Sequence, residues 1–379
     1  MTAFKKILKK IFPLVFLKKA FQLYNSIRIR TVDRLLFPEF RLKEKDFLIY
    51  RQGYPFRENN VDISDIHDDQ VRQYMHAWYQ WTQEEYLLVF DNVCYVEPKI
   101  GWAIVWPNKL VYYSLGISRT PFLPKPDFFR WIGKVKAIEV PCAISLRDTG
   151  EENYFHFYND VLAKLFFLRT HGVSIAKTPV IIAKKLWEKP YFRYYYEHSA
   201  LLQSLQWIVQ DREYVRCEKL ICCKPLTHQP KLLAEVFHPL MITKTGQRKI
   251  FVTRTNKRMR FINNSADIEN VCRKYGIEVV DCDKLSPAQQ IEIFANAGFI
   301  AGIHGAGLTN IFFRSGNCRV LEIFPPPDEG YLPFHYLMLA KMKGFVYDAI
   351  VGYRRQSRFK PGFDVDVKEL ENKIRSVNA

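Results

Sequence analysis

The chain has 379 residues, of which 48% are hydrophobic and 15% aromatic, and so much apolar surface excludes a protein that is disordered throughout. The length exceeds what one ordinary core needs and fits two domains of ~150 residues each. A net charge of +17 favours an anionic partner, which can be nucleic acid, anionic lipid or a phosphorylated substrate.

The first 30 residues are the most basic part of the chain and predict an amphipathic helix. They hold eight Lys or Arg and no acid, which leaves the rest of the chain a charge of +9. Lysines lie off a face on which apolar residues recur at helical spacing, namely Phe4, Ile7, Leu8, Ile11, Phe12 and Val15. A spanning helix needs ~20 apolar residues, so this segment fits a helix that lies on an anionic membrane surface instead.

The basic segment has two other interpretations. One is a helix that packs on the protein's own core and keeps a solvated basic face. The other is nucleic-acid binding, which we do not expect because no recognition motif accompanies the lysines.

The eight cysteines show no metal-binding spacing and no C-x-x-C pair. No secretory signal with a cleavage site is visible. We therefore expect free, mostly buried thiols in a reducing compartment, and a lumenal enzyme with disulfides is the alternative.

Residues 31–225 are predicted to form a mixed α/β domain, because short apolar runs alternate with turn signals. The expected strands are 86–89, 103–106, 111–115, 135–143 and 178–183, and the expected helices are 69–82, 153–170 and 200–210. Tryptophans at 78, 81, 102 and 106 either line a sugar platform or pack in the core and on the surface.

Two polar residues on the predicted helix 153–170 are candidates for acid–base chemistry. His156 and Asp160 are four residues apart and therefore share one face. An aspartate can orient or ionise a histidine at this spacing, and either group could take a proton from an acceptor hydroxyl. A local His–Asp pair on a solvated helix face is the alternative.

After a polar, proline-containing linker around residues 224–246, strands and helices alternate cleanly. Strands are expected at 249–254, 278–281, 298–303 and 319–324, helices at 268–275 and 286–297, and one more helix and strand at 331–352. This interval is typical of βαβ units with a parallel sheet, so residues 246–352 are predicted to form a Rossmann-like domain. Residues 364–379 are expected to form a charged helix that can return to the first domain.

The stretch from residue 298 to residue 327 holds the clearest candidate ligand site. Its glycine-rich loop, His304 to Gly307, follows a buried strand and precedes a short helix at 308–313. Such strand-to-helix loops bind ligands in open α/β sheets, and the N–H groups of Gly307 and Leu308 could hold a diphosphate. The glycines fit neither the dinucleotide pattern nor a P-loop, so a tight turn without a ligand is the alternative.

Three motifs, in this order along the chain, resemble those of glycosyltransferase family 61. They are Asn153 to Asp160, then Phe251 to Arg254 with Arg260 and Asn263 after it, then Gly302 to Asn310 with Val320 to Pro325 after it. The similarity covers about residues 140–350.

The resemblance implies a GT-B fold, with two Rossmann-like domains that face a cleft and the donor bound mainly by the second. It also implies an inverting, metal-independent transfer from a UDP-sugar to a hydroxyl, with no cofactor. Asp160 or His156 is then the base that removes the acceptor proton. The residues expected to bind the donor are Arg254, Arg260, Gly302, His304, Gly305, Ala306, Gly307, Leu308, Thr309, Asn310 and Glu322, with Arg258 as a further candidate.

Within this set the arginines would neutralise the charge that builds on the leaving diphosphate. Glu322 would accept hydrogen bonds from ribose or sugar hydroxyls, and Asn310 would brace the loop. One feature competes with a metal-independent reaction: Asp281 and Asp283 form a D-x-D sequence of the kind that holds Mn²⁺ or Mg²⁺. The alternative is a loop in which Asp283 starts the next helix.

We see no signal-anchor span such as animal members of the family have. We therefore expect a bacterial-type enzyme of capsule or lipopolysaccharide biosynthesis, cytoplasmic and peripheral on the inner face of the cytoplasmic membrane. Its acceptor would be a cell-surface glycan or a lipid-linked glycan. Two alternatives are a catalytically inactive nucleotide-sugar- or carbohydrate-binding protein and a basic membrane-surface scaffold.

Overall fold

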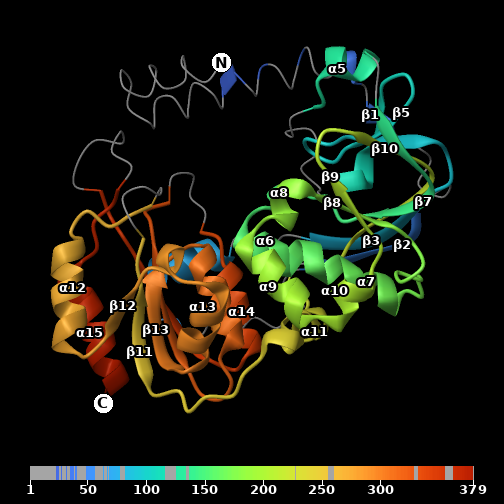
Figure 1. The fold of residues 1–379 in the computed structure, drawn as a ribbon. Helices are drawn as coiled ribbons and strands as arrows, with labels where there is room; N and C mark the ends of the chain where they lie inside the picture. The colour runs from blue at the N-terminus through green and yellow to red at the C-terminus, as the bar shows by residue number, and fades with distance from the viewer. Residues whose placement is uncertain are drawn as a thin grey trace. The chain divides into compact units, whose positions relative to one another are not determined.

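A computed structural model supplies the structure of the chain (Figure 1). It describes residues 23–24, 27, 31, 35–37, 39–40, 48–55, 63, 66, 68–76, 82–115, 125–133, 136–226, 228–254, 260–327, 332–354 and 362–378. The predicted amphipathic helix in residues 1–30 and the candidate Arg258 lie outside these residues. The chain divides into two compact units: the C-terminal unit combines 55–82 with 240–379, and the central unit combines 21–54 with 83–239.

The C-terminal unit is built on a parallel sheet, which Figure 1 shows between two layers of helices. In the described chain the strand order is β12 (Glu278–Val280), β11 (Arg248–Val252), β13 (Ala297–Ile303), β14 (Arg319–Phe324) and β15 (Val346–Val351). All four neighbouring pairs are parallel. The near-continuous apolar runs of β13 and β14 follow from this arrangement, because helices cover both faces.

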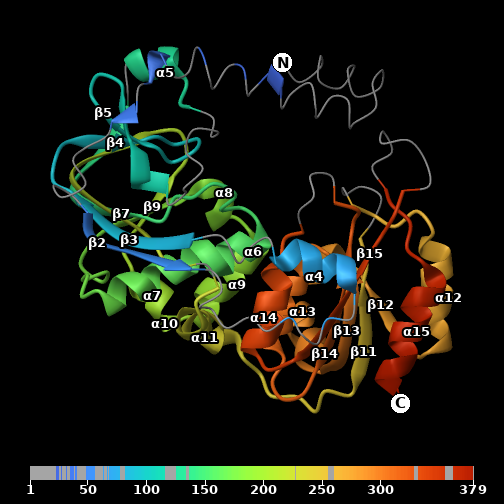
Figure 2. The ribbon, with the colours of Figure 1, turned by 180° about the vertical axis from the view of Figure 1, so that it is seen from behind.

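Helices cover both faces of this sheet. One layer holds α12 (Ser265–Lys274) and α15 (Val367–Asn378), and the other holds α13 (Pro287–Ala295), α14 (His335–Met342) and the 3₁₀ helix η9 (Ala306–Phe313). A further helix, α4 (Asp69–His76), packs beside β15, as Figure 2 shows. The predicted mixed α/β class with a parallel sheet is therefore confirmed.

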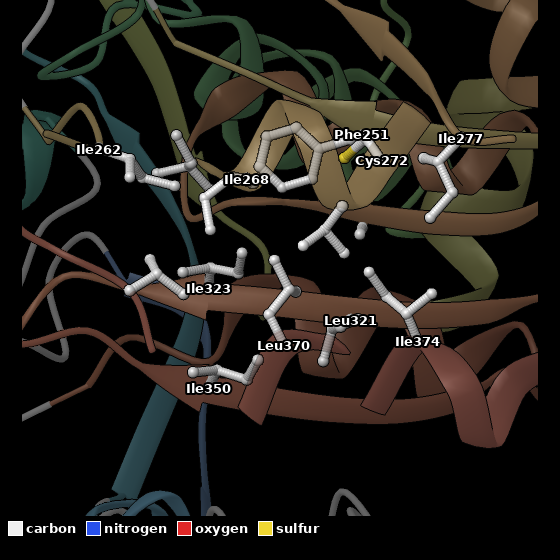
Figure 3. Close-up of a cluster of buried hydrophobic side chains, with 14 of the residues drawn as sticks. Phe251, Ile262, Ile268, Cys272, Ile277, Leu321, Ile323, Ile350, Leu370 and Ile374 are labelled. Carbon is white, nitrogen blue, oxygen red and sulfur yellow. The ribbon is translucent and has the colours of Figure 1, made fainter. Parts of the chain in front are cut away.

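The placement of α15 differs from the expectation that this helix can return to the first domain. Leu370 and Ile374, one turn apart, are buried in the hydrophobic cluster of the C-terminal unit, and Figure 3 shows them among Leu321, Ile323 and Ile350. Apolar residues at this spacing bury a stripe of the helix against the strands and α12, which accounts for its position.

The central unit carries a mixed sheet. In the described residues its main path runs β1 (Glu39–Phe40), β6 (Lys109–Val111), β5 (Ala103–Val105), β4 (Cys94–Val96), β10 (Tyr214–Lys224), β7 (Ala137–Ser145), β8 (Val180–Ala183) and β9 (Trp207–Gln210), while β3 (Thr82–Phe90) pairs with both β10 and β2 (Leu48–Pro55). Strands β10, β7, β8 and β9 are mutually parallel, so their carboxyl ends share one edge.

The helices of the central unit connect and cover these strands. They are α5 (Phe128–Ile132), α6 (Tyr154–His156), the π-helix η6 (Phe157–Leu162), α7 (Ala163–Thr170), α8 (Lys184–Trp187), α9 (Pro190–His198), α10 (Ala200–Ser204) and α11 (Pro230–Phe237). Short 3₁₀ turns occur at η4 (Tyr112–Leu115), η7 (His238–Leu240) and, in the C-terminal unit, η8 (Cys282–Lys284).

Three local predictions differ from the structure of this region. The helix predicted over 200–210 ends at Ser204, because the β-branched Ile208 and Val209 extend to pair with β8 as β9. The strand predicted over 111–115 becomes the turn η4 after Val111. The predicted linker contains α11, which begins with Pro230 after a Gln229 side-chain cap.

Candidate functional site

Three buried polar side chains form a connected group across β13, β14 and β15: His304 directly follows β13, Glu322 lies in the second half of β14, and Tyr347 is the second residue of β15. Nδ1 of His304 contacts a carboxylate oxygen of Glu322, and the second oxygen of Glu322 accepts a hydrogen bond from the Tyr347 hydroxyl at 2.6 Å. His304 follows β13, and its own N–H donates to Ile323 O at 2.8 Å, which holds the loop against β14. The ring of His304 stacks on Phe324 with centroids 5.2 Å apart.

Burial sets the protonation of His304 and Glu322. It lowers the pKa of His304 well below its ordinary value of 6.5, and the charges of Arg260 and Arg254 act in the same direction. It raises the pKa of Glu322 to about 8, against the opposing effects of the Tyr347 hydrogen bond and the Arg260 charge. His304 and Glu322 together therefore hold one proton at neutral pH.

Two arginines lie beside the group formed by His304, Glu322 and Tyr347. Arg254 follows β11, and its Nη1 donates to His304 O at 3.0 Å. Arg260 has a φ of 66°, in the left-handed region that non-glycine residues rarely occupy, at a cost of about 1–3 kcal/mol. Both side chains are half-buried, so this edge of the sheet presents positive charge to an anion.

Glycine is required where Arg254 crosses the loop. A Cβ on Gly305 would lie 2.5 Å from Arg254 Nη1, and a Cβ on Gly302 would lie 2.8 Å from Val252 Cβ. At Gly307 the nearest atoms, Cys282 Sγ and a Val252 methyl carbon, would be 3.2 Å from a Cβ. The glycines thus let β11 and the arginine approach the backbone closely, as the sequence pattern indicated.

The remaining residues of the glycine motif divide into buried and accessible ones. Leu308, Thr309 and Asn310 are buried, and Asn310 Nδ2 donates to Gln290 Oε1 at 3.0 Å and to Gly307 O at 3.1 Å. Asn310 thus braces the loop, which is the role expected for it from the sequence. Ala306 and Gly307 are partly exposed and remain accessible.

Glu322 has a different environment from the one expected. It is fully buried, and its two oxygens contact His304 and Tyr347. The geometry makes it a partner of His304 rather than a group that contacts ribose directly. Tyr347, which sequence reasoning missed, lies on a strand that was predicted, but nothing in its local pattern indicates a partner 25 residues away.

A second polar group lies in the central unit, on the helical segment that follows β7. Asn153 caps this segment by accepting from the Phe155 N–H at 2.9 Å. His156 Nδ1 lies 2.5 Å from Asp160 Oδ2, and Asn159 Nδ2 donates to Asp160 Oδ1 at 2.8 Å. Asp160 belongs to the π-helix η6, a rare conformation that is frequent at functional sites.

The two members of this pair titrate in opposite directions. Burial acts to lower the pKa of His156, but the hydrogen bond and charge of Asp160 outweigh it and raise the pKa above 6.5. Burial acts to raise the pKa of Asp160, but the hydrogen bond and charge of His156 outweigh it, with help from Asn159, and lower it. Asp160 therefore stays ionised and orients the ring, and His156 is the group suited to accept a proton.

Other charged residues beneath this pair were also missed by the sequence reasoning. Lys164 Nζ forms a buried ion pair with Asp148 at 2.7 Å and donates to Arg147 O at 2.9 Å. Burial lowers the pKa of Lys224 at the end of β10. Asp148 comes a few residues after the strand predicted over 135–143, and this position was the available signal. The sequence did not show that its partner would be Lys164.

The D-x-D sequence forms a local turn. Asp281 Oδ1 accepts from the Asp283 N–H at 3.1 Å, and Asp281 Oδ2 lies 3.5 Å from Lys284 Nζ. In the described part of the chain, no group of three His, Cys, Asp or Glu side chains is placed to hold a metal ion.

The tryptophans do not gather into one platform within the described residues. Trp102 is fully buried in a core cluster, whereas Trp106 is 61% exposed. Trp78 and Trp81 lie outside the described residues. The helices that the structure describes include none that could traverse a lipid bilayer.

Comparison with known proteins finds one family model that matches the stretch containing most residues of both polar groups. The family model for Glycosyltransferase 61 matches residues 154–321. Residues 154–321 are therefore similar to glycosyltransferase family 61. This match supports the family resemblance. The matched range contains His156, Asp160, Arg254 and His304 and ends one residue before Glu322.

Two curated proteins that are similar to the chain share the name EGF domain-specific O-linked N-acetylglucosamine transferase. The chain is 29% identical over 135 residues to the Pan troglodytes protein, which covers 33% of this chain and 24% of the relative. It is 25% identical over 245 residues to the Drosophila melanogaster protein, which covers 55% of this chain and 45% of the relative. The chain thus spans less than half the length of these relatives.

Proposed function

We propose that the protein is an inverting glycosyltransferase that moves a sugar from a UDP-sugar to an acceptor hydroxyl. The observation that carries this proposal is the pair of arginines beside the His304–Glu322–Tyr347 group, at the carboxyl edge of a parallel sheet. This edge is where open α/β folds bind nucleotides. The family 61 match over residues 154–321 supports the same reaction class.

In the proposed reaction the C-terminal unit binds the donor. Arg254 and Arg260 neutralise the charge that develops on the departing diphosphate, so the step needs no metal ion. The accessible N–H of Gly307 adds a hydrogen-bond donor. With Nδ1 committed to Glu322, Nε2 is the ring nitrogen of His304 left to meet the donor.

The central unit activates the acceptor in this proposal. His156 Nε2 removes the hydroxyl proton while Asp160 holds the opposite ring nitrogen. The oxygen then attacks the anomeric carbon as the bond to the diphosphate breaks on the opposite face, which inverts the configuration. The two units are accordingly the acceptor-side and donor-side domains of a GT-B enzyme.

The finer assignments extend this proposal. The printed name of the relatives supports N-acetylglucosamine as the first donor sugar to test. We propose a bacterial-type enzyme of capsule or lipopolysaccharide biosynthesis that acts on a cell-surface or lipid-linked glycan. The basic residues 1–30 would hold it on the inner face of the cytoplasmic membrane.

The test is UDP release from a panel of UDP-sugars, with and without chelator, combined with calorimetric binding of UDP. Arg254→Ala should lower kcat/KM by roughly 100- to 1,000-fold because it removes a charge that acts on the leaving group. Arg248→Ala is the matched control: Arg248 begins the same strand, at the opposite edge, and pairs with Glu278. It should leave activity unchanged.

Other outcomes would contradict parts of the proposal. UDP-sugar binding without release by any acceptor would indicate an inactive binding protein. No UDP binding with retained lipid binding would indicate a membrane-surface scaffold. Activity lost in chelator would contradict metal independence and direct attention to Asp281.

A further inference from the structure

A surface hollow in the central unit lies outside both groups described above. It has a volume of about 610 Å³ and is lined by Lys184, Trp187, Glu188, Arg193 and Val209. Its lining comes from the helices that follow β8 and from β9, so it opens near the carboxyl ends of two parallel strands. This volume falls within the ~300–1,000 Å³ range of small-ligand sites.

The walls of the hollow combine an aromatic surface with a stacked arginine. The guanidinium carbon of Arg193 lies 5.1 Å from the ring centre of Trp187 and 5.5 Å from that of Tyr196. Trp187 packs against Trp207 and Phe192, which hold its ring in place. A guanidinium stacked on an aromatic ring keeps its N–H fork directed outward, the geometry that binds a carboxylate in bidentate fashion.

The charges at the hollow favour a ligand group with a single negative charge. Lys184 forms an ion pair with Asp211 at 3.1 Å, and Glu188 adds a negative charge to the wall. Arg193 is exposed and forms no ion pair with any residue that the structure describes. One uncompensated positive charge matches a carboxylate, whereas a dianionic phosphate would meet Glu188 without a second free cation.

The helix that lines the hollow contacts the segment that carries His156. Tyr191 of α9 donates through its hydroxyl to Glu152 O at 2.6 Å, and Lys189 Nζ lies 3.3 Å from the Glu152 carboxylate. The ring of Tyr191 also packs on Tyr154, with centroids 5.2 Å apart. The helix that lines the hollow therefore contacts the residues immediately before the His156–Asp160 pair.

We propose that this hollow binds a carboxylate-bearing sugar of the acceptor glycan. The carboxylate pairs with Arg193, and the apolar C–H face of the sugar ring packs on Trp187 and Val209. Binding of an acidic sugar is the proposal itself, and its assignment to the acceptor rests on the glycosyl-transfer function proposed above.

The test compares binding of tetragalacturonate with binding of maltotetraose, a neutral chain of the same length, by calorimetry on the full chain. Wild type should bind the acidic chain and not the neutral one. Arg193→Gln should weaken binding roughly tenfold or more, since it removes a charge-assisted hydrogen bond. Glu188→Gln should tighten it.

Arg169→Gln is the matched control. Arg169 is also exposed and lies over an aromatic ring, 5.7 Å from the centre of Phe166, but it does not line the hollow. Its variant should bind like wild type. Absence of tetragalacturonate binding, equal binding of maltotetraose, or equal losses in the two arginine variants would overturn the proposal.

Two further measurements separate this site from the proposed activity. Glucose 6-phosphate that binds more tightly than the uronate would overturn the choice of a carboxylate. UDP release without tetragalacturonate binding would remove the site and leave the transferase proposal intact. Tetragalacturonate binding without UDP release from any donor would support the site and contradict the transferase proposal.

Discussion

The buried pair of His304 and Glu322 makes stability depend on pH in a defined window. The folded pair holds one proton, because burial raises the pKa of Glu322 to about 8 and lowers that of His304 below its ordinary 6.5. In the unfolded chain the two groups titrate near 4.5 and 6.5, and they hold no proton above the higher value. Between pH 6.5 and about 8 the folded state therefore binds one proton more than the unfolded state.

The sign and size of the effect follow from this difference. The stability due to the raised pKa of Glu322 is complete below its unfolded value and is lost as pH rises through the folded value. The lowered pKa of His304 acts in the opposite direction below pH 6.5, where the histidine of the unfolded chain also binds a proton. A difference of one proton is worth about 1.4 kcal/mol per pH unit. Because the unfolded His304 and the folded Glu322 are each half-titrated at one end of the window, the free energy of unfolding should fall by ~1 kcal/mol between pH 6.5 and pH 8.

Glu322→Gln removes the titration of Glu322 and so isolates its contribution to the pH dependence of stability. The amide oxygen can accept from Tyr347 and the amide nitrogen can donate to His304, so the hydrogen bonds of the neutral pair are retained while the titration is removed. Urea unfolding across about pH 5.5 to 8 should show a decline for wild type that is absent from the variant. Glu292→Gln, an exposed glutamate paired with Lys244 at 3.6 Å, is the control and should keep the decline. Parallel curves for wild type and Glu322→Gln would refute the reasoning.

Two further predictions concern the arginine and the base. Gly305→Ala places a methyl group 2.5 Å from Arg254 Nη1, which is the end of a flexible side chain that can move away. The temperature of thermal unfolding should therefore change little, while UDP affinity should fall about as far as it does in Arg254→Ala. Unchanged UDP affinity would contradict this prediction. In Asp160→Asn the raised pKa of His156 should return downward, so the acidic limb of the kcat/KM profile should move to lower pH and the rate should drop. An unshifted limb would mean that His156 is not the base.

Local sequence was sufficient to predict most elements of the C-terminal unit. The apolar runs and the glycine loop predicted β13, η9 and β14 within two residues at each boundary, because helices cover this sheet on both faces and its strands must be apolar throughout. The spacing of His156 and Asp160 likewise placed their side chains together, since four residues make one helical turn. Prediction was poorer for 200–210, where the last four residues of a predicted helix pair with β8 as β9.

Sequence by itself thus determined most strands and helices of the C-terminal unit, the family motifs that the chain contains, and several polar residues that follow strands. Tertiary structure alone decided which of those residues meet: Tyr347 with Glu322, Lys164 with Asp148, and α15 with the C-terminal core. The physical reason is the separation along the sequence over which each kind of interaction acts. Periodicity and capping act over a few neighbouring residues, whereas the partner of a buried polar group depends on which distant segments pack beside it.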